Sequence, residues 1–152
     1  MNSDSNTPLM LITGGSRGVG AATARLAAER GYDVALSYVS NESAALAVVA
    51  DVKAFGRRAL AIRADSADPN QIKQLFMGID REFGRIDVLI NNAAIIAHHS
   101  RVEDLSFERM QRIFAVNSIG PMLYAQRRRK GCLIVIRAAE ASSSISLRPL
   151  LA

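Results

Sequence analysis

The stretch that decides the fold is Thr13-Gly14-Gly15-Ser16-Arg17-Gly18-Val19-Gly20. The apolar residues 9–12 before it are typical of a buried strand, and the alanine-rich residues 21–29 after it are typical of a helix. A glycine-rich turn between a strand and a helix presents free backbone N–H groups to an anion. The helix dipole adds roughly half a positive charge at the same place. The stretch therefore predicts a loop that binds the phosphates of a dinucleotide.

Three glycines of this loop have separate expected roles. Gly14 permits the tight turn, Gly18 allows a pyrophosphate to approach the backbone, and Gly20 allows the helix to pack against the strand. A glycine pattern by itself is weak, and a flexible surface turn is its alternative interpretation. The strand before the loop and the helix after it favour nucleotide binding.

Hydrophobic periodicity predicts a regular alternation of strands and helices. We expect strands at 9–13, 33–38, 59–63, 86–90 and 133–136, and helices over about 18–30, 42–55 and 69–84. A fourth helix follows Ser106 and is interrupted at Gly120-Pro121, and Asp68 and Ser106 are expected N-caps. This order predicts an α/β fold with a Rossmann-like, doubly wound parallel sheet, truncated after about strand five.

Length and composition indicate one soluble globular domain. The chain has 152 residues, of which 49% are hydrophobic and 22% charged. We divide it into a flexible N-terminus (1–8), a Rossmann dinucleotide-binding region (9–125) and an atypical basic and serine-rich tail (126–152). No apolar run approaches the ~20 residues that span a bilayer. Residues 1–8 lack a secretion signal and Cys132 is the single cysteine, so we expect a cytoplasmic location.

The formal net charge of +5 belongs entirely to the tail. Residues 126–152 hold six basic side chains and one acidic one, which leaves 13 of each in the rest of the chain. The basic run 127–130 contains no aromatic residues, so a solvated helix end is a better interpretation than a nucleic-acid site. We expect neither a nucleic-acid nor a membrane partner. The adjacent His98 and His99 have no partner ligands at metal-binding spacing, and we expect no metal site.

Two further segments complete a family pattern. Asn91-Asn92-Ala93-Ala94 follows the apolar run 86–90, and Asn117 lies within the segment 115–118. Together with the TGxxxGxG pattern at 13–20, these segments resemble the N-terminal half of the classical short-chain dehydrogenase/reductase family, over about residues 9–125. The resemblance implies an NAD(P)(H)-dependent oxidoreductase that transfers hydride between a ketone and a secondary alcohol. Full-length members usually form homo-oligomers. Ala94 replaces the usual glycine, and a positive φ there would strain it.

The resemblance also implies which residues bind the cofactor. The glycine loop would hold the phosphates, and residues following later strands would line the adenosine side: Thr13, Gly14, Ser16, Arg17, Gly18, Val19 and Gly20, then Asp65, Asn92 and Ala93. Asp65 stands where the family's acidic residue contacts the adenine ring, and a turn-forming aspartate is the alternative.

The choice between the two dinucleotides depends on two positions. Arg17 could pair with a 2′-phosphate. The end of the second strand, 37–40, lacks the carboxylate that NAD-preferring dehydrogenases place against the ribose hydroxyls. Both features favour NADP(H) over NAD(H), although Val39 stands where NADP-preferring relatives often carry a second arginine.

The resemblance makes Asn117 the catalytic asparagine, which bends its helix and holds a water in a proton relay; a polar helix-end residue is the alternative. The family's catalytic serine, tyrosine and lysine are not found, since no tyrosine is followed by lysine four residues later. We interpret Tyr124 as a packing residue. The composition changes abruptly after residue 125, which predicts a truncation or an altered reading frame.

We therefore expect the chain alone to be inactive, and its small carbonyl or alcohol substrate is not identified. Two alternatives stay open: a non-catalytic nucleotide-binding fragment, and a truncated product without a stable fold, because exposed sheet edges invite aggregation.

Overall fold

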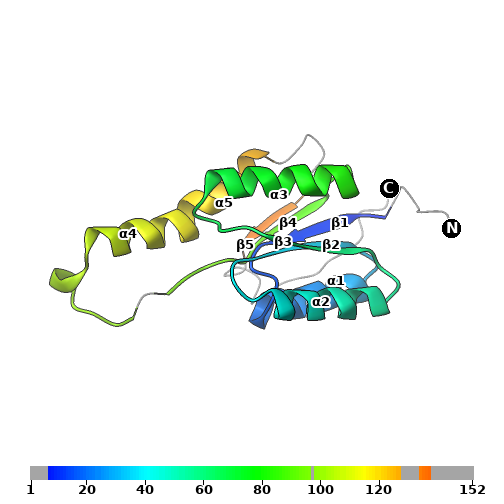
Figure 1. The fold of residues 1–152 in the computed structure, drawn as a ribbon, viewed down its shortest axis with the longest axis horizontal. Helices are drawn as coiled ribbons and strands as arrows, with labels where there is room; N and C mark the ends of the chain where they lie inside the picture. The colour runs from blue at the N-terminus through cyan, green and yellow to red at the C-terminus, as the bar shows by residue number, and fades with distance from the viewer. Residues whose placement is uncertain (1–6, 97, 128–133, 138–152) are drawn as a thin grey trace.

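A single parallel sheet forms the centre of the molecule (Figure 1). The computed structural model describes residues 7–96 and 98–127 and the backbone of 134–137. The strand order is β3-β2-β1-β4-β5. Neighbouring strands of the described sheet are all parallel, as predicted. The strands are β1 (Leu9–Ile12), β2 (Asp33–Tyr38), β3 (Ala59–Arg63), β4 (Val88–Asn91) and β5 (Ile134–Arg137). The chain proceeds outward from β1 to β3 and then returns to place β4 on the other side of β1. A switch in strand order of this kind creates a crevice at the carboxyl ends of the strands.

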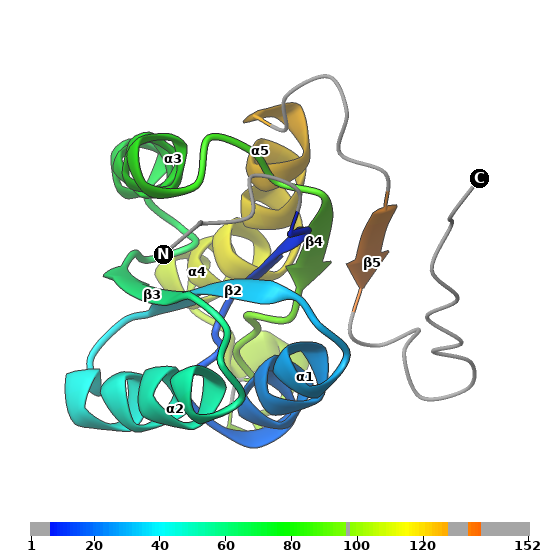
Figure 2. The same ribbon diagram turned by 90° about the vertical axis from the view of Figure 1, so that its right-hand side faces the viewer.

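Helices cover both faces of the sheet, as Figure 2 shows in a view turned by 90° from Figure 1. One face carries α1 (Gly18–Glu29) and α2 (Glu42–Ala54), and the other carries α3 (Pro69–Glu82) and α5 (Gly120–Arg127). The short η1 (Val102–Asp104) precedes α4 (Phe107–Phe114), and a π-helical turn, η2 (Ala115–Ile119), joins α4 to α5. The predicted Rossmann-like α/β fold is confirmed.

The core lies in two layers because both faces of each central strand are buried. Met10 and Ile12 of β1 pack with α1 and α2, whereas Leu9 and Leu11 pack with α3 and Tyr124. Successive side chains of a strand point to opposite faces, so these four apolar residues in a row supply both layers. A continuous apolar strand therefore indicates a sheet covered on both sides.

The predicted helix starts are confirmed by their caps. An Asp68 carboxylate oxygen accepts hydrogen bonds from the backbone N–H groups of Asn70 and Gln71, and Pro69 occupies the first turn of α3. The Ser106 hydroxyl accepts a bond from the Arg109 N–H at the start of α4. These residues satisfy N–H groups that a helix leaves without internal partners.

Several element boundaries differ from the predictions. β1 ends at Ile12 rather than residue 13, and β4 begins at Val88 rather than 86. Before β4, Asp87 is bound to the start of β1, because its carboxylate accepts a hydrogen bond of 2.7 Å from the Leu9 N–H. The predicted strand 133–136 is observed as 134–137, and residue 133 lies outside the described residues. So do Cys132 and the serine run of the tail.

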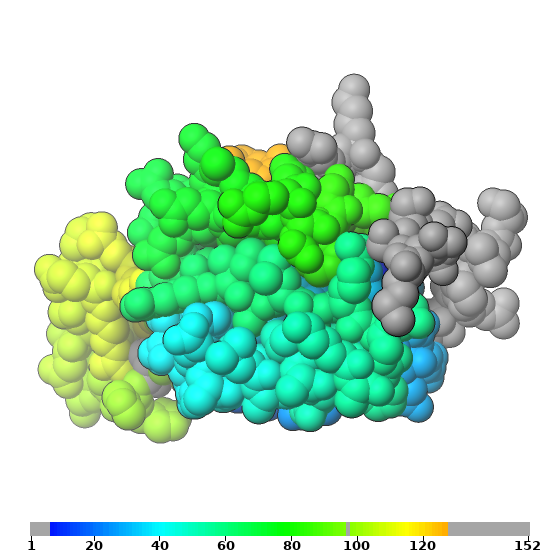
Figure 3. All heavy atoms as spheres, turned by 45° about the vertical axis from the view of Figure 1, so that its right-hand side comes forward, coloured from blue at the N-terminus to red at the C-terminus, as the bar shows by residue number. Residues whose placement is uncertain are grey.

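The long C-terminal helix is distorted earlier than predicted. The π-helical turn begins at Ala115, and Gly120-Pro121 starts α5 rather than ending a helix. Pro121 has no N–H, so it cannot make the α-helical bond to the carbonyl four residues back, which is that of Asn117. α4 buries none of its residues and extends beyond the end of the sheet in the ribbon of Figure 1. In the space-filling view of Figure 3 this yellow segment forms one side of the molecule. Within the described part of the chain, no helix is both long and apolar enough to span a bilayer.

Candidate dinucleotide-binding cleft

The glycine loop leaves β1 in a tight turn that β2 holds in place. Gly14 has a φ of +63°, a backbone conformation that favours glycine, as predicted for the turn. Its N–H donates to the Ser37 hydroxyl over 3.1 Å, and the Gly15 N–H donates to the Ser37 carbonyl over 2.9 Å. Ser37 is buried and therefore fixes the loop from the neighbouring strand.

The positive end of α1 opens onto this loop without a side-chain cap. Arg17 is the N-cap residue, but its side chain makes no capping bond, and the first turn contains no acidic residue. The N-termini of α2, α3 and α4 are all capped by a side chain, from Asn41, Asp68 and Ser106. The uncapped N–H groups and the dipole of α1 are therefore free to bind an anion.

Asn92 and Thr13 join the ends of β4 and β1 beneath the loop. The Asn92 side-chain N–H₂ donates to the carbonyls of Thr13 and Gly14, at 2.9 and 3.0 Å. The Thr13 hydroxyl oxygen accepts bonds from the backbone N–H groups of Asn92 and Ala93, at 3.0 and 2.9 Å. The side chains of Thr13 and Asn92, both predicted to bind the cofactor, thus form hydrogen bonds within the protein.

Gly20 approaches this hydrogen-bonded junction closely. A Cβ at Gly20 would lie 2.5 Å from the Gly14 carbonyl oxygen and 2.5 Å from the Asn92 amide nitrogen. The predicted role in packing α1 is supported, but the contact is with the loop and Asn92 rather than with a strand. A Cβ at Gly18, by contrast, would meet nothing within 4 Å. That backbone is open to a ligand.

These elements enclose a cleft of about 460 Å³. Eight of the predicted binding residues line it: Gly14, Ser16, Arg17, Gly18, Val19, Asp65, Asn92 and Ala93. Thr13, Gly20 and Asn117 are not among the lining residues. The lining also includes residues that the sequence prediction did not name as binding residues: Tyr38, Val39, Ser40, Asn41, Ala44, Ser66, Ala94, Ile95, Arg112 and Val116. Most of these follow the ends of predicted strands, a signal that could have identified them.

Asp65 lines the cleft and also forms a turn. One carboxylate oxygen accepts a bond of 2.9 Å from the Ala67 N–H, which is the turn-forming role. The other oxygen lies 2.8 Å from a guanidinium nitrogen of Arg112. Both interpretations of Asp65 are therefore compatible with its geometry. No sequence pattern links Arg112 to this position, because the pair joins α4 to the turn after β3.

Among the lining residues, the charged ones are Arg17, Asp65 and Arg112. The end of β2 contributes Tyr38 and the uncharged Val39 and Ser40 instead of a carboxylate. Burial raises the pKa of Tyr38, as do its hydrogen bond to Glu42 and the charge of that carboxylate, while Arg63 lowers it. Tyr38 therefore stays neutral and adds no negative charge to the cleft.

Asn117 braces the loop that follows β4. Its side-chain oxygen accepts a bond of 2.9 Å from the Ile95 N–H, and its nitrogen donates to the Ile95 carbonyl over 2.8 Å. The residue lies in the π-helical turn, in agreement with the predicted helix distortion. Both polar atoms of its side chain are thus bonded to the backbone of Ile95, which ties the π-helical turn to the loop after β4.

Tyr124 has the properties of a packing residue, as predicted. It is 1% exposed, and its ring centroid lies 5.9 Å from that of Phe76. Burial raises its pKa more than the neighbouring Ser66 and Ser37 lower it, and the charge of Asp65 adds a smaller rise. A catalytic tyrosine that gives up its proton needs a lowered pKa instead.

The structure also shows the surroundings of Ala94 and of the two adjacent histidines. No non-glycine residue in the described ranges has a positive φ, so Ala94 occupies its place without the strain considered above. His98 and His99 are exposed, and the His98 carbonyl accepts a bond from Arg109. The described residues contain no group of three or more His, Cys, Asp or Glu side chains placed to hold a metal ion.

The sheet order and the glycine loop at the switch between β1 and β4 define a dinucleotide-binding α/β domain. A family model described as short chain dehydrogenase matches residues 8–135. The chain belongs to this family.

Similar proteins are oxidoreductases. The chain is 40% identical over 115 residues to the uncharacterized oxidoreductase YgfF of Escherichia coli (strain K12), covering 76% of this chain and 47% of that protein. It is 36% identical over 117 residues to an L-rhamnose 1-dehydrogenase (NAD(P)(+)) of Sphingomonas sp. (strain SKA58), covering 77% and 46%. A short chain dehydrogenase from Burkholderia cenocepacia J2315 in complex with NADP superposes with a TM-score of 0.75 and 41% identity, covering 78% and 48%. The chain spans about half the length of these relatives.

Proposed function

We propose that the cleft binds NADP(H) in preference to NAD(H), and that the chain is the nucleotide-binding half of an oxidoreductase that transfers hydride between this cofactor and a ketone or secondary alcohol. The observation that carries the proposal is the uncapped N-terminus of α1 facing the glycine loop. In this proposal the pyrophosphate lies against the backbone of Gly18 and Val19, where the helix dipole favours negative charge. When bound, the cofactor supplies the hydride chemistry.

The preference for NADP(H) rests on charge at the ribose end. Arg17 is exposed, lines the cleft and forms no ion pair with any described residue, so it is available to a 2′-phosphate. The lining residues after β2 bring no carboxylate against a ribose 2′-hydroxyl. The similar short chain dehydrogenase from Burkholderia cenocepacia, which was solved in complex with NADP, supports the preference for NADP(H) by analogy.

We propose no hydride transfer by this chain alone. The sequence has no tyrosine followed four residues later by lysine, and Tyr124 is buried with a raised pKa. Asn117 is proposed as the asparagine of the proton relay, and its side chain is bonded to the Ile95 backbone at both the oxygen and the nitrogen. Dinucleotide binding without turnover is therefore the activity expected.

Replacing Arg17 by alanine tests the proposal. Titration calorimetry on the unmodified chain should detect both dinucleotides, with NADPH bound more tightly than NADH. The variant should lose about tenfold or more in NADPH affinity, because a hydrogen bond to a charged group contributes roughly 1.5–3 kcal/mol. Its NADH affinity should change by less than about threefold.

Arg30→Ala is the matched control, because Arg30 is exposed at the opposite end of α1. It should leave both affinities unchanged. A folded chain that binds neither dinucleotide contradicts the proposed function, and an equal loss of NADPH and NADH in the Arg17 variant contradicts the assignment of the 2′-phosphate.

A further inference from the structure

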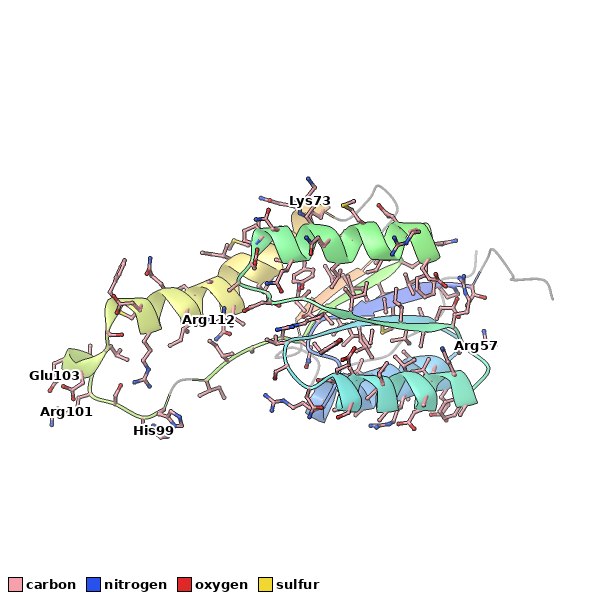
Figure 4. The ribbon with its side chains drawn as sticks, in the orientation of Figure 1. Arg57, Lys73, His99, Arg101, Glu103 and Arg112 are labelled. Carbon is pink, nitrogen blue, oxygen red and sulfur yellow. The ribbon has the colours of Figure 1, made fainter. Side chains whose placement is uncertain are left out.

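One ion pair crosses the adenosine end of the cleft and joins α4 to the rest of the protein. The Arg112 guanidinium on α4 lies 2.8 Å from the Asp65 carboxylate after β3, with side chains 46% and 22% exposed. Both residues line the cleft. Figure 4 shows Arg112 on the part of α4 near the sheet, whereas Arg101 and Glu103 lie at the far end of this segment.

The Asp65 carboxylate is held at both of its oxygens. Arg112 pairs with one oxygen, and the Ala67 N–H donates to the other. The backbone N–H of Asp65 donates to the Gln71 side chain over 2.9 Å. Each carboxylate oxygen has two lone pairs, so one bond per oxygen leaves acceptor capacity for a ligand. The plane of the carboxylate is set while it can still accept a hydrogen bond in the cleft.

The helix that carries Arg112 is anchored beside this turn. α4 buries no residue of its own, but η2 and α5, which continue it, bury Val116, Gly120 and Tyr124. A Cβ at Gly120 would lie 2.4 Å from the Ser66 carbonyl oxygen, so the helix backbone touches the residue next to Asp65. Asn117 is bonded to Ile95, which also lines the cleft. Arg112 is thus presented to Asp65 from a fixed support.

We propose that Arg112 is a positioning residue for adenine recognition: it orients Asp65 to accept a hydrogen bond from the 6-amino group of the adenine ring. The inference rests on the proposed function. Arg112 would act through Asp65, without contacting the amino group itself. An exposed or half-exposed ion pair contributes little to folding stability. Its effect should therefore appear in ligand selectivity rather than in melting temperature.

An analogue of NADPH in which hypoxanthine replaces adenine separates this effect from general binding. The analogue carries a carbonyl oxygen where adenine has its amino group, and a carboxylate repels that oxygen. The unmodified chain should bind NADPH about tenfold or more tightly than the analogue in titration calorimetry. Arg112→Gln should reduce this ratio to about threefold or less, with analogue affinity changed less than about twofold. Arg112→Lys, which keeps the charge, should restore part of the ratio.

Two further variants control the measurement. Asp65→Asn should abolish or invert the ratio, because an amide N–H₂ can donate to the hypoxanthine oxygen. Arg25→Gln breaks an exposed Arg–Asp pair of 2.7 Å that links α1 to α2, outside the cleft lining, and should leave the ratio unchanged. A chain that binds neither nucleotide contradicts the proposed function itself. If both bind, the inference is overturned by an unchanged ratio in Arg112→Gln, or by an equal loss of both ligands.

Discussion

Replacing Gly20 by alanine should destabilise the protein and abolish measurable dinucleotide binding. The new methyl group would lie 2.5 Å from both the Gly14 carbonyl oxygen and the Asn92 amide nitrogen. Neither is the end of a flexible side chain: one is backbone, and the other is bonded to the Thr13 and Gly14 carbonyls. Overpacking of this kind costs roughly 1–3 kcal/mol. Relief requires α1 to move away from the loop, which removes its N-terminus from the proposed phosphate position.

Gly78→Ala is the control for this effect. Gly78 is also a helical glycine, but a Cβ there would meet only the terminal methyl carbon of Ile62, at 3.0 Å. Alanine has a higher helix propensity than glycine by about 1 kcal/mol, so this variant should be neutral or slightly stabilising. Urea unfolding and NADPH titration of both variants provide the measurement. Equal stabilities of the two variants would contradict the close packing of α1 on the loop.

Replacing Thr13 by valine should cost about 2–3 kcal/mol of unfolding free energy, because it leaves two partly buried N–H donors without their acceptor. The Thr13 hydroxyl accepts bonds from the Asn92 and Ala93 N–H groups, and the residue is 2% exposed. Valine has nearly the same shape, so packing changes little and the loss is polar. Urea denaturation gives the free energy directly, provided that unfolding is two-state.

Thr13→Ser is the matched variant, because it keeps the hydroxyl and removes only a methyl group. It should lose roughly 1 kcal/mol, the usual cost of removing one buried methyl group. If serine and valine prove equally destabilising, the hydroxyl does not hold the ends of β1 and β4 together as described. The valine variant should also weaken NADPH binding, since Asn92 and Ala93 line the cleft.

Local sequence patterns were sufficient for most of the architecture. The buried strands are continuous apolar runs, and β2 and β3 have the predicted bounds. Asp68 and Ser106 could be identified as helix starts from the sequence, because a cap bonds N–H groups only two or three residues away. The start of β4 was misplaced because Asp87 belongs to a bond with Leu9, a partner 78 residues away. Periodicity contains no information about such a partner.

The candidate site was predictable only in part, for the same reason. Gly14 and Gly18 could be identified because their φ values are properties of one residue and of the turn it forms. Thr13 and Asn92 were placed in the correct region, but their bonding to each other's backbone appeared only in the structure. Arg112 was missed, since an arginine on a helix carries no local sign of the carboxylate that it meets.

The sequence by itself determined the alternation of strands and helices and the glycine turn that opens α1, because both depend on residues within a few positions of one another. Only the tertiary structure decided which side chains meet at the carboxyl edge of the sheet. Parallel strands bring segments such as 13–20, 65–66 and 92–95 together there, although long crossovers separate them in the chain. The cleft, the brace from Asn117 to Ile95 and the pairing of Arg112 with Asp65 are consequences of that convergence.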